Sequence, residues 1–376
     1  MEALILSCGT GGGHDAAAAA IAQALHAAGH RCDCLNPYTL LGSRVAKRID
    51  QTYIKTVQYA PKVFGVVYWL GELYERVSSK KSPVYRMNYA HRHALQAYLQ
   101  AHNYDVIIIT HVFPGELLTA LQADGQQLPP IIYCTTDYTC APFTAEVKAD
   151  AYIIAHRDLL AEFQRHGLAA TQLYPFGIPV QAAFQQPKSS LQAKIALGLD
   201  VTHEYWLVAG GSLGMGNLHA VLKNVVALIQ NYPNKQLIII TGQQKRVQAQ
   251  LKQRYGQNPQ VQLLAHTTRM AEYLQACECY LTKPGGLSST EAIVAQIPLI
   301  HLQPLPGVEP KNQQFFVEHG LSFKAETFEQ LQAAITQVQN PQVRLQMVNK
   351  QAVHATPEAA TAIVALAQQF VAAKMR

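Results

Sequence analysis

The sequence predicts an α/β protein of two similarly built domains, and three observations support this prediction. Each half opens with a short apolar run that breaks into glycines before a helical sequence: Leu4–Cys8 precedes Gly9–Gly13, and Tyr205–Ala209 precedes Gly210–Gly216. Most strand candidates are continuous apolar runs, as expected when helices cover both faces of a parallel sheet. The length of 376 residues also accommodates two domains of about 150 residues each.

The strand candidates alternate with helical stretches, which favours βαβ units over an antiparallel sheet. We expect strands at Ala3–Leu6, Arg31–Leu35, Val106–Thr110, Ile131–Thr135, Ala151–Ala155, Tyr205–Ala209, Gln236–Thr241, Val261–Leu264, Cys279–Thr282 and Leu299–Leu302. We expect helices at Asp15–Ala28, Arg86–Ala101, Gly115–Gln122 and Arg157–His166.

The domain boundaries follow from changes in composition. We expect an N-terminal domain over 1–180 and a Gln- and Pro-containing linker over 181–190. A second domain is expected over 191–350, and 351–376 is expected to form a C-terminal helix that packs back on the first domain. Two such domains facing each other would form a cleft between the carboxyl ends of their sheets.

Composition excludes several classes of protein. Charged residues make up 14% of the chain, and the net charge is +6 with a pI near 8.8. This balance favours anionic ligands or an anionic membrane surface and gives no indication of nucleic-acid binding. No apolar run reaches the ~18 residues of a membrane span, and the N-terminus lacks a basic leader, so we expect a cytoplasmic protein. The seven scattered cysteines predict reduced, buried thiols.

The N-terminal glycine turn carries His14. Backbone amides at a helix start attract anions or oxygen-rich ligands, and Gly12 and Gly13 let the chain approach them closely. The positive end of the helix dipole disfavours a second positive charge there, so the imidazole is expected to stay near its neutral form. A neutral imidazole can accept a proton, and His14 is therefore our candidate general base.

A second glycine-bearing turn follows the predicted strand Cys279–Thr282. Gly285 and Gly286 precede Ser288 and Glu291 at an expected helix start, which suits a diphosphate resting on amides and hydroxyls. Glu291 could accept hydrogen bonds from a ribose diol. Ser288 and Glu291 equally match a capping box, which stabilises a helix without any ligand.

The segment after Leu299–Leu302 is rich in proline and is expected to form a rigid loop. Within it, Glu309 and Asn312 could bind sugar hydroxyls. The alternative is that both are ordinary polar loop residues.

Basic and aromatic residues alternate between Leu40 and Tyr89. This mixture suits a membrane interface, where rings lie at headgroup level and cations meet anionic lipid. The alternative is a pair of amphipathic helices whose aromatic side chains lie in the core. The residues that we expect at the acceptor or the membrane are Tyr68, Trp69, Lys80, Lys81 and Arg86.

Several common motifs are absent from the sequence. Neither half has a G-x-G-x-x-G followed by a ribose-binding acid, so a dinucleotide cofactor is poorly supported. There is no P-loop, no G-x-S-x-G elbow and no D-x-D pair for a metal-dependent sugar transferase. We therefore expect neither a cofactor nor a metal ion.

Taken together, the motifs resemble those of the diacylglycerol glycosyltransferases, which include the monogalactosyldiacylglycerol synthases and bacterial diacylglycerol glucosyltransferases. The segments that resemble this group are Ser7–His14, Thr136–Asp137, Gly177–Val180 and Gly210–Gly216. Two further segments, Thr282–Glu291 and Pro306–Asn312, resemble the donor domain of family 28 glycosyltransferases.

The resemblance implies a GT-B fold with two Rossmann-like domains. It implies an inverting, metal-independent transfer of a hexose from UDP-glucose or UDP-galactose to diacylglycerol or a related glycolipid, by a peripheral protein at the cytosolic membrane face. In the implied site His14 is the base, and the UDP-sugar is bound by Gly12, Gly13, Ser212, His266, Thr267, Gly285, Gly286, Leu287, Ser288, Glu291, Glu309 and Asn312. The implied partners are the UDP-sugar, diacylglycerol and anionic membrane lipids, without nucleic acid.

Two alternative functions remain open. One is a transferase that uses another acceptor, such as a polyprenyl-linked sugar or a small molecule. The other is a catalytically silent protein that binds UDP-sugars. The choice between UDP-glucose and UDP-galactose also stays open at this point.

Overall fold

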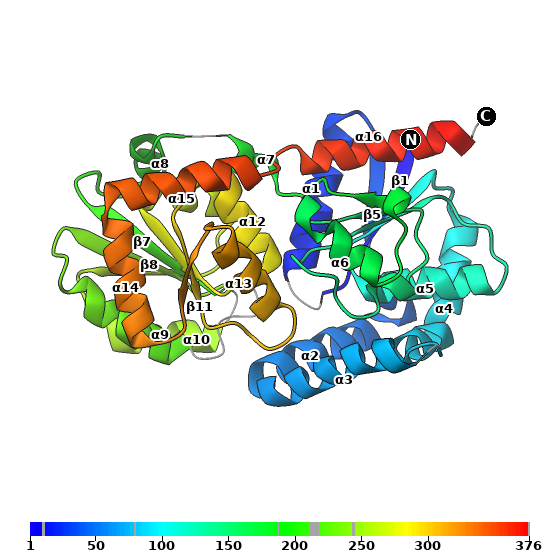
Figure 1. The fold of residues 1–376 in the computed structure, drawn as a ribbon, viewed down its shortest axis with the longest axis horizontal. Coiled ribbons are helices and arrows are strands. Elements are labelled where there is room, and N and C mark those ends of the chain that lie inside the picture. The colour runs from blue at the N-terminus through cyan, green and yellow to red at the C-terminus, as the bar shows by residue number, and fades with distance from the viewer. Residues whose placement is uncertain (10–11, 79, 187, 211–217, 243–244, 375–376) are drawn as a thin grey trace. The chain divides into compact units, whose positions relative to one another are not determined.

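The structure is a computed structural model that describes residues 1–9, 12–78, 80–186, 188–210, 218–242 and 245–374. The chain divides into two compact units. Unit 1 comprises Met1–Gln181, Pro306–Val308 and Thr356–Arg376, and unit 2 comprises Ala182–Leu305 and Glu309–Ala355. Each unit holds its own parallel sheet with helices against it (Figure 1), so the predicted α/β fold class is confirmed.

The sheet of unit 1 has the strand order β2-β1-β3-β4-β5-β6. All of its pairs are parallel, with Ala3 of β1 opposite Cys32 of β2 and Val106 of β3. The carboxyl ends of β1, β3 and β4 therefore meet at one edge. The strands are β1 (Glu2–Leu6), β2 (Arg31–Leu35), β3 (Val106–Ile109), β4 (Ile131–Cys134), β5 (Ala151–Ile153) and β6 (Leu173–Tyr174).

The helices of unit 1 cover both faces of its sheet. One face packs on α1 and α16, where Ile21 and Ile363 join Ile5 and Ile108 in one buried cluster. Alternate side chains of a strand point to the opposite face, where α5 lies close above Ile109. The helices are α1 (Gly12–Ala27), α2 (Ser43–Tyr59), α3 (Pro61–Val77), α4 (Pro83–Ala101), α5 (Val112–Ala123), α6 (Leu160–Arg165) and α16 (Ala359–Lys374).

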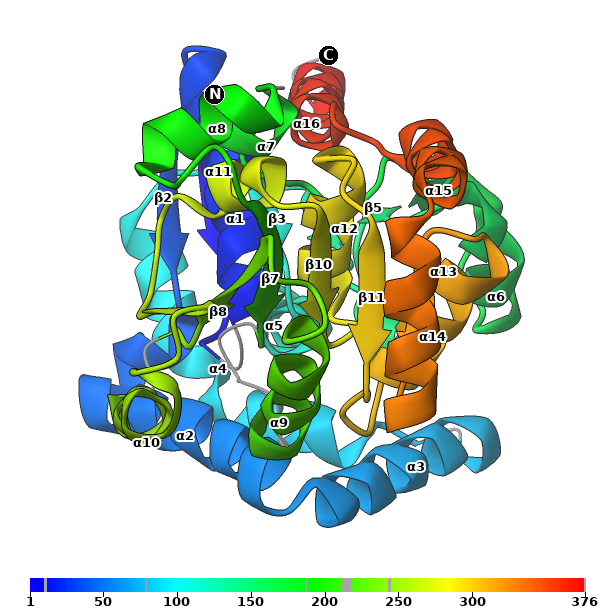
Figure 2. The ribbon, with the colours of Figure 1, turned by 90° about the vertical axis from the view of Figure 1, so that its left-hand side faces the viewer.

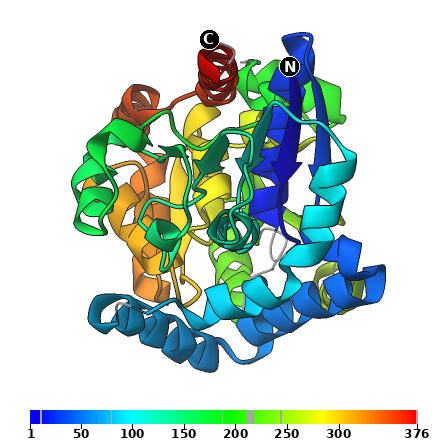
Figure 3. The same cartoon turned by 90° about the vertical axis from the view of Figure 1, so that its right-hand side faces the viewer.

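Helices α2 and α3 lie at the end of unit 1 where its strands finish. Figure 3 shows them in blue below the arrowheads of the sheet. Asp50 of α2 closes against the carboxyl end of β1, because a Cβ atom at Gly9 would lie 2.6 Å from Asp50 Oδ2. The segment with alternating basic and aromatic residues thus belongs to the same edge of the sheet as the glycine turn.

Unit 2 repeats this construction with the strand order β12-β11-β10-β7-β8-β9. A buried cluster that contains the fully buried Trp206 of β7 joins the sheet to α9, α10 and α14. Figure 2 shows the ribbons of these helices and of the sheet. The strands are β7 (Glu204–Ala209), β8 (Lys235–Ile240), β9 (Val261–Leu264), β10 (Cys279–Thr282), β11 (Leu299–Leu302) and β12 (Phe323–Ala325). The helices are α7 (Ala182–Gln185), α8 (Ser190–Leu197), α9 (Leu218–Ile229), α10 (Lys245–Tyr255), α11 (Met270–Ala276), α12 (Gly286–Val294), α13 (Glu309–Glu318), α14 (Phe328–Gln339) and α15 (Pro341–His354).

The chain passes from unit 1 to unit 2 after Gln181, within the stretch 181–190 where a linker was expected, and this stretch contains the short helix α7. One expectation about the C-terminal end of the chain is wrong. The expected single helix over 351–376 is two helices, because α15 continues to His354 and α16 begins at Ala359. Pro357 lies in the break, where its missing N–H and fixed φ interrupt the helical hydrogen bonds. Thr356 packs on Gly177, whose φ of +94° and lack of a side chain leave room for it.

The expectation that all cysteines are buried is also wrong. All seven thiols are free, but Cys34 is exposed and Cys32 is half-buried. Both lie on β2, which is an edge strand of its sheet, so only one side of the strand is covered by a neighbour.

Candidate functional site

His14 lies in the first turn of α1, directly beyond the carboxyl end of β1. Its Nδ1 atom is 2.7 Å from the carbonyl oxygen of Thr110 and 3.0 Å from Thr136 Oγ1. A carbonyl oxygen can only accept a hydrogen bond, so Nδ1 carries the proton. In a neutral imidazole this leaves the lone pair on Nε2. The ends of β3 and β4 therefore fix the tautomer that a general base requires.

The glycine turn is shorter than the sequence suggests. Gly12 and Gly13 were expected before the helix, but α1 already begins at Gly12. Glycine is tolerated there because the first-turn amides have no partner within the helix. Asp15 lies in the same turn, where its negative charge interacts favourably with the positive end of the helix dipole. Its Oδ1 accepts a hydrogen bond of 2.6 Å from Ser7 Oγ.

His111 is a neighbour of His14 that sequence reasoning missed. The two ring centroids are 4.5 Å apart, and the rings are nearly perpendicular at 84°. His111 caps α5, because its Nδ1 accepts a hydrogen bond of 3.1 Å from the backbone N–H of Phe113. Burial, and next the proximity of His14, hold the pKa of His111 well below its ordinary value. The only available signal was its position just after a buried strand.

Asp50 completes the surroundings of the β1 turn. It is half-buried on α2, and Asn36 Nδ2 donates to its Oδ2 over 3.4 Å. Burial raises the pKa of Asp50 above its ordinary value, and the nearby Asp15 adds to this effect. Two carboxyl groups thus lie beside the turn that bears His14.

In unit 2, α12 begins at Gly286, and Gly285 caps it without a side-chain hydrogen bond. Gly286, Leu287 and Ser288 therefore form the first helical turn, whose amides can meet an anion. The capping-box interpretation of Ser288 and Glu291 is wrong, because Ser288 lies inside the helix rather than before it. Gly285 and Gly286 can adopt the geometry of a helix start as readily as that of a turn. The helix therefore begins at Gly286, three residues before the start that a capping box at Ser288 would give.

Glu291 remains a candidate ligand-binding residue. It is half-buried on α12, and its carboxylate makes no hydrogen bond or ion pair with the described residues. Desolvation raises its pKa to about 8. A carboxyl group held in this way can exchange hydrogen bonds with hydroxyl groups of a ligand.

Glu309 and Asn312 lie in the first turn of α13, not in the loop where we expected them. The Glu309 carboxylate forms a buried ion pair with Lys283 and accepts a hydrogen bond of 2.8 Å from the N–H of Leu305. Asn312 Nδ2 donates to the carbonyl oxygen of Pro284 over 3.1 Å. These contacts join the turn after β10 to the start of α13.

The remaining candidates lie beyond other strands of the same sheet edge. His266 is exposed after β9, and Thr267 Oγ1 accepts a hydrogen bond of 3.0 Å from the N–H of Arg269. β9 is three strand positions from β10, or roughly 14 Å at the usual strand spacing. Ser212 lies outside the described residues. Within the described part of the chain, no group of three potential metal ligands occurs.

Helix α3 exposes a continuous apolar stripe. Its members recur at helical spacing and are between 39% and 74% exposed: Val63, Val66, Val67, Leu70, Leu73 and Val77. Trp69 is 57% exposed beside them, whereas Tyr68 is half-buried. The alternative in which the aromatic side chains of these helices lie in the core is therefore wrong for α3, which has no buried residue.

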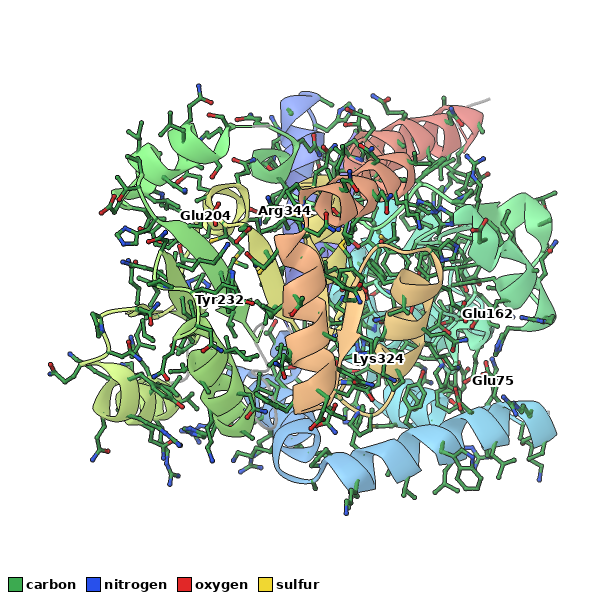
Figure 4. All side chains as sticks on the ribbon, turned by 60° about the vertical axis from the view of Figure 1, so that its left-hand side comes forward. Glu75, Glu162, Glu204, Tyr232, Lys324 and Arg344 are labelled. Carbon is green, nitrogen blue, oxygen red and sulfur yellow. The ribbon has the colours of Figure 1, made fainter. Side chains whose placement is uncertain are left out.

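The opposite side of α3 holds the helix against unit 1. Glu75, labelled in Figure 4, accepts a hydrogen bond of 3.3 Å from the N–H of Phe143. Its Oε2 atom lies 3.5 Å from Nδ1 of His166. Lys80, Lys81 and Arg86 follow on the exposed surface. The apolar stripe is thus flanked by cations at its carboxyl end.

Two family models match the chain. The model described as monogalactosyldiacylglycerol (MGDG) synthase matches residues 14–180, and the glycosyltransferase family 28 C-terminal domain matches residues 206–365. The two matched stretches follow one another along the chain and together cover most of it. The first match begins at His14, and the second contains every candidate residue of unit 2, including Ser212, which lies outside the described residues.

The chain is similar to named bacterial enzymes. The processive diacylglycerol beta-glucosyltransferase of Staphylococcus epidermidis is 27% identical to it over 59% of this chain and 56% of its own length. The enzyme of the same name from Staphylococcus carnosus is 27% identical over 62% of this chain and 59% of its own length. The chain thus spans less than two thirds of the length of these relatives.

Solved structures show the fold of this chain. MurG of Acinetobacter baumannii matches 98% of this chain and 99% of its own, with a TM-score of 0.65 and 18% identity. The Staphylococcus aureus MnaA–UDP structure matches 96% of this chain and 94% of its own, with a TM-score of 0.63 and 12% identity. The expected GT-B fold is therefore confirmed.

Proposed function

We propose that the protein transfers a hexose from UDP-glucose or UDP-galactose to diacylglycerol or a related glycolipid, with inversion at the anomeric carbon and without a metal ion. The observation that carries the proposal is the fixed tautomer of His14 in the domain that matches the MGDG synthase model. The named relatives, which are diacylglycerol glucosyltransferases, support the acceptor.

In this reaction the primary hydroxyl of the acceptor attacks the anomeric carbon of the sugar. Its proton passes to His14 Nε2, because Nδ1 is already occupied by the Thr110 carbonyl oxygen. The bond between the anomeric carbon and the phosphate oxygen breaks, and UDP leaves. Attack from the face opposite UDP turns an α-linked donor into a β-glycosyl lipid.

The leaving UDP gains negative charge, and the start of α12 suits that charge. First-turn amides and the positive helix end stabilise a developing anion without rearranging. Ser288 would add a hydroxyl group, and Glu291, in the next turn of α12, would accept hydrogen bonds from the ribose. Glu309 and Asn312, held by Lys283 and Pro284, would contact the sugar.

Helix α3 would hold the protein on the membrane that contains its acceptor. Its exposed apolar stripe can enter the interface, and Lys80, Lys81 and Arg86 can meet anionic headgroups. Among the described residues no helix is long and apolar enough to cross a bilayer. We therefore propose a peripheral protein at the cytosolic membrane face.

Incubation of the protein with diacylglycerol vesicles and UDP-glucose or UDP-galactose should yield a β-glycosyl lipid, detected by mass spectrometry. His14→Ala should lower kcat at least about 100-fold, because general-base catalysis typically contributes this much. Binding of UDP, measured by calorimetry, should remain. Folded protein that produces no glycolipid from either donor contradicts the proposed function, and near-normal turnover of His14→Ala contradicts the base.

A further inference from the structure

Two imidazoles meet at the carboxyl ends of β1 and β3, and only one of them is needed as a base. His14 and His111 lie with their ring centroids 4.5 Å apart. His111 is 6% exposed and is held by its cap on α5 and by Phe113, whose ring centroid is 4.6 Å away. These contacts hold the ring of His111 in one orientation.

The hydrogen bonds give the two rings opposite tautomers. His14 Nδ1 faces a carbonyl oxygen and is the donor, so its Nε2 is an acceptor. His111 Nδ1 faces the N–H of Phe113 and is the acceptor, so in the neutral ring its Nε2 is a donor. A positively charged His111 would place a second N–H against that of Phe113, and burial independently disfavours the charge.

The Nε2–H of His111 is available to a ligand. Among the described residues nothing accepts a hydrogen bond from it, and the residue is 6% exposed. The pair thus offers one acceptor and one donor nitrogen, on rings whose centroids are 4.5 Å apart. Such a pair fits a ligand with a hydroxyl group next to an oxygen that can only accept.

We propose that His111 is a specificity-determining residue, whose Nε2–H binds the ester carbonyl oxygen next to the hydroxyl that His14 deprotonates. The inference rests on the proposed function and names the acceptor class within it. In a 1,2-diacylglycerol the C3 hydroxyl is adjacent to the ester at C2. A 1,2-dialkylglycerol has the same hydroxyl and chains but only an ether oxygen, which is a weaker acceptor.

The test compares these two lipids at equal surface density in the same vesicles. The wild-type protein should use the ester lipid about 10-fold better in kcat/KM than the ether lipid, as expected for one hydrogen bond that the site is built to make. His111→Ser keeps a good helix cap but removes the Nε2–H. It should bring the ratio of the two lipids close to one, mainly by lowering kcat/KM for the ester.

Two controls separate recognition from folding. His111→Asn keeps the cap and supplies an amide N–H, so it should restore part of the preference for the ester. His14→Ala should slow both lipids by the same factor and leave the ratio unchanged. The melting temperatures of His111→Ser and His111→Asn should agree closely, because both residues cap helices well.

A second measurement does not depend on turnover. Nitrogen-15 NMR of the imidazoles near pH 7.5 should show His111 protonated at Nε2 and His14 protonated at Nδ1. The opposite tautomer of His111, an ester-to-ether ratio near one in the wild type, or an unchanged ratio in His111→Ser overturns this inference alone. Transfer to neither lipid by the wild-type protein contradicts the proposed function, and the inference falls with it.

Discussion

Lys283 and Glu309 form a buried ion pair that ties two turns of unit 2 together. Lys283 is 8% exposed and Glu309 is 7% exposed. Glu309 also receives the N–H of Leu305, so its carboxylate has two fixed partners. A buried carboxylate is tolerated only while such partners remain, because its loss of hydration must be offset.

Lys283→Met should therefore lower the free energy of unfolding by about 3–5 kcal/mol, since it leaves Glu309 charged and unpaired. The measurement is denaturant unfolding. Lys324→Met is the matched control, because Lys324 pairs with Glu326 on the surface and should cost less than about 1 kcal/mol. Equal effects of the two variants would show that the buried pair has no special role.

At this scale the sequence predicts some site residues and misses others. His14 is predictable because a glycine turn after an apolar strand is a local pattern. His111 is not, since its role depends on a ring 97 positions away in the chain. The partnership of Lys283 with Glu309 depends on adjacent parallel strands, and no spacing rule encodes it.

Among the helices, α3 differs most from ordinary protein surface. Its exposed valines and leucines form one stripe, whereas exposed apolar residues elsewhere are more scattered. A contiguous apolar patch of this kind marks an interaction surface. We propose that this surface meets the membrane interface, because cations follow it directly.

Val66→Gln combined with Leu70→Gln should weaken binding to vesicles at least about 10-fold, since two apolar side chains lose their transfer into the interface. Vesicle flotation measures the effect. Leu345→Gln with Val353→Gln is the matched control, because both residues are highly exposed on α15 of unit 2. If both pairs reduce flotation equally, the stripe of α3 is not the docking surface.

The sequence predicts the long parallel strands of both sheets to within about two residues, because buried strands are continuous apolar runs. It misses β6 and β12, which have only two and three residues and lie outside the continuous apolar runs that mark the other strands, including the equally short β5. The sequence also leaves open what the apolar side of α3 faces, because an apolar stripe has the same pattern whether it faces a core or a membrane.

On the scale of the whole molecule, each unit buries one titratable group, and the two groups change the stability of the fold with pH in opposite directions. In unit 2, burial lowers the pKa of His301 to about 3, and its ring is bonded to Ser289 and Ser322. In unit 1, burial and then Glu146 raise the pKa of Glu116 to about 9. His301 therefore destabilises the fold as the pH falls from 6.5 toward 3.

Glu116 destabilises the fold as the pH rises. Its native form holds a proton that the unfolded chain releases above about pH 4.5, so its contribution is complete below that value and is lost as the pH rises through about 9. Glu116→Gln mimics the protonated carboxyl group and cannot ionise. It should be more stable than the wild type by roughly 1–3 kcal/mol at pH 8.

The measurement is the free energy of unfolding of both proteins between pH 4.5 and 9. The difference should be smallest at the acid end and grow with pH. The loss of stability that His301 causes at low pH should be the same in both proteins. A constant difference across this range would mean that Glu116 does not hold its proton in the native state.

The outward-facing valines and leucines of α3 also determine how the protein must be handled. In plain aqueous buffer they expose hydrocarbon to water, and molecules at high concentration will cover it by associating with one another. Preparations should therefore become monodisperse when a mild detergent or a lipid nanodisc is added. A kinetic assay in detergent-free buffer would measure a clustered preparation rather than single molecules.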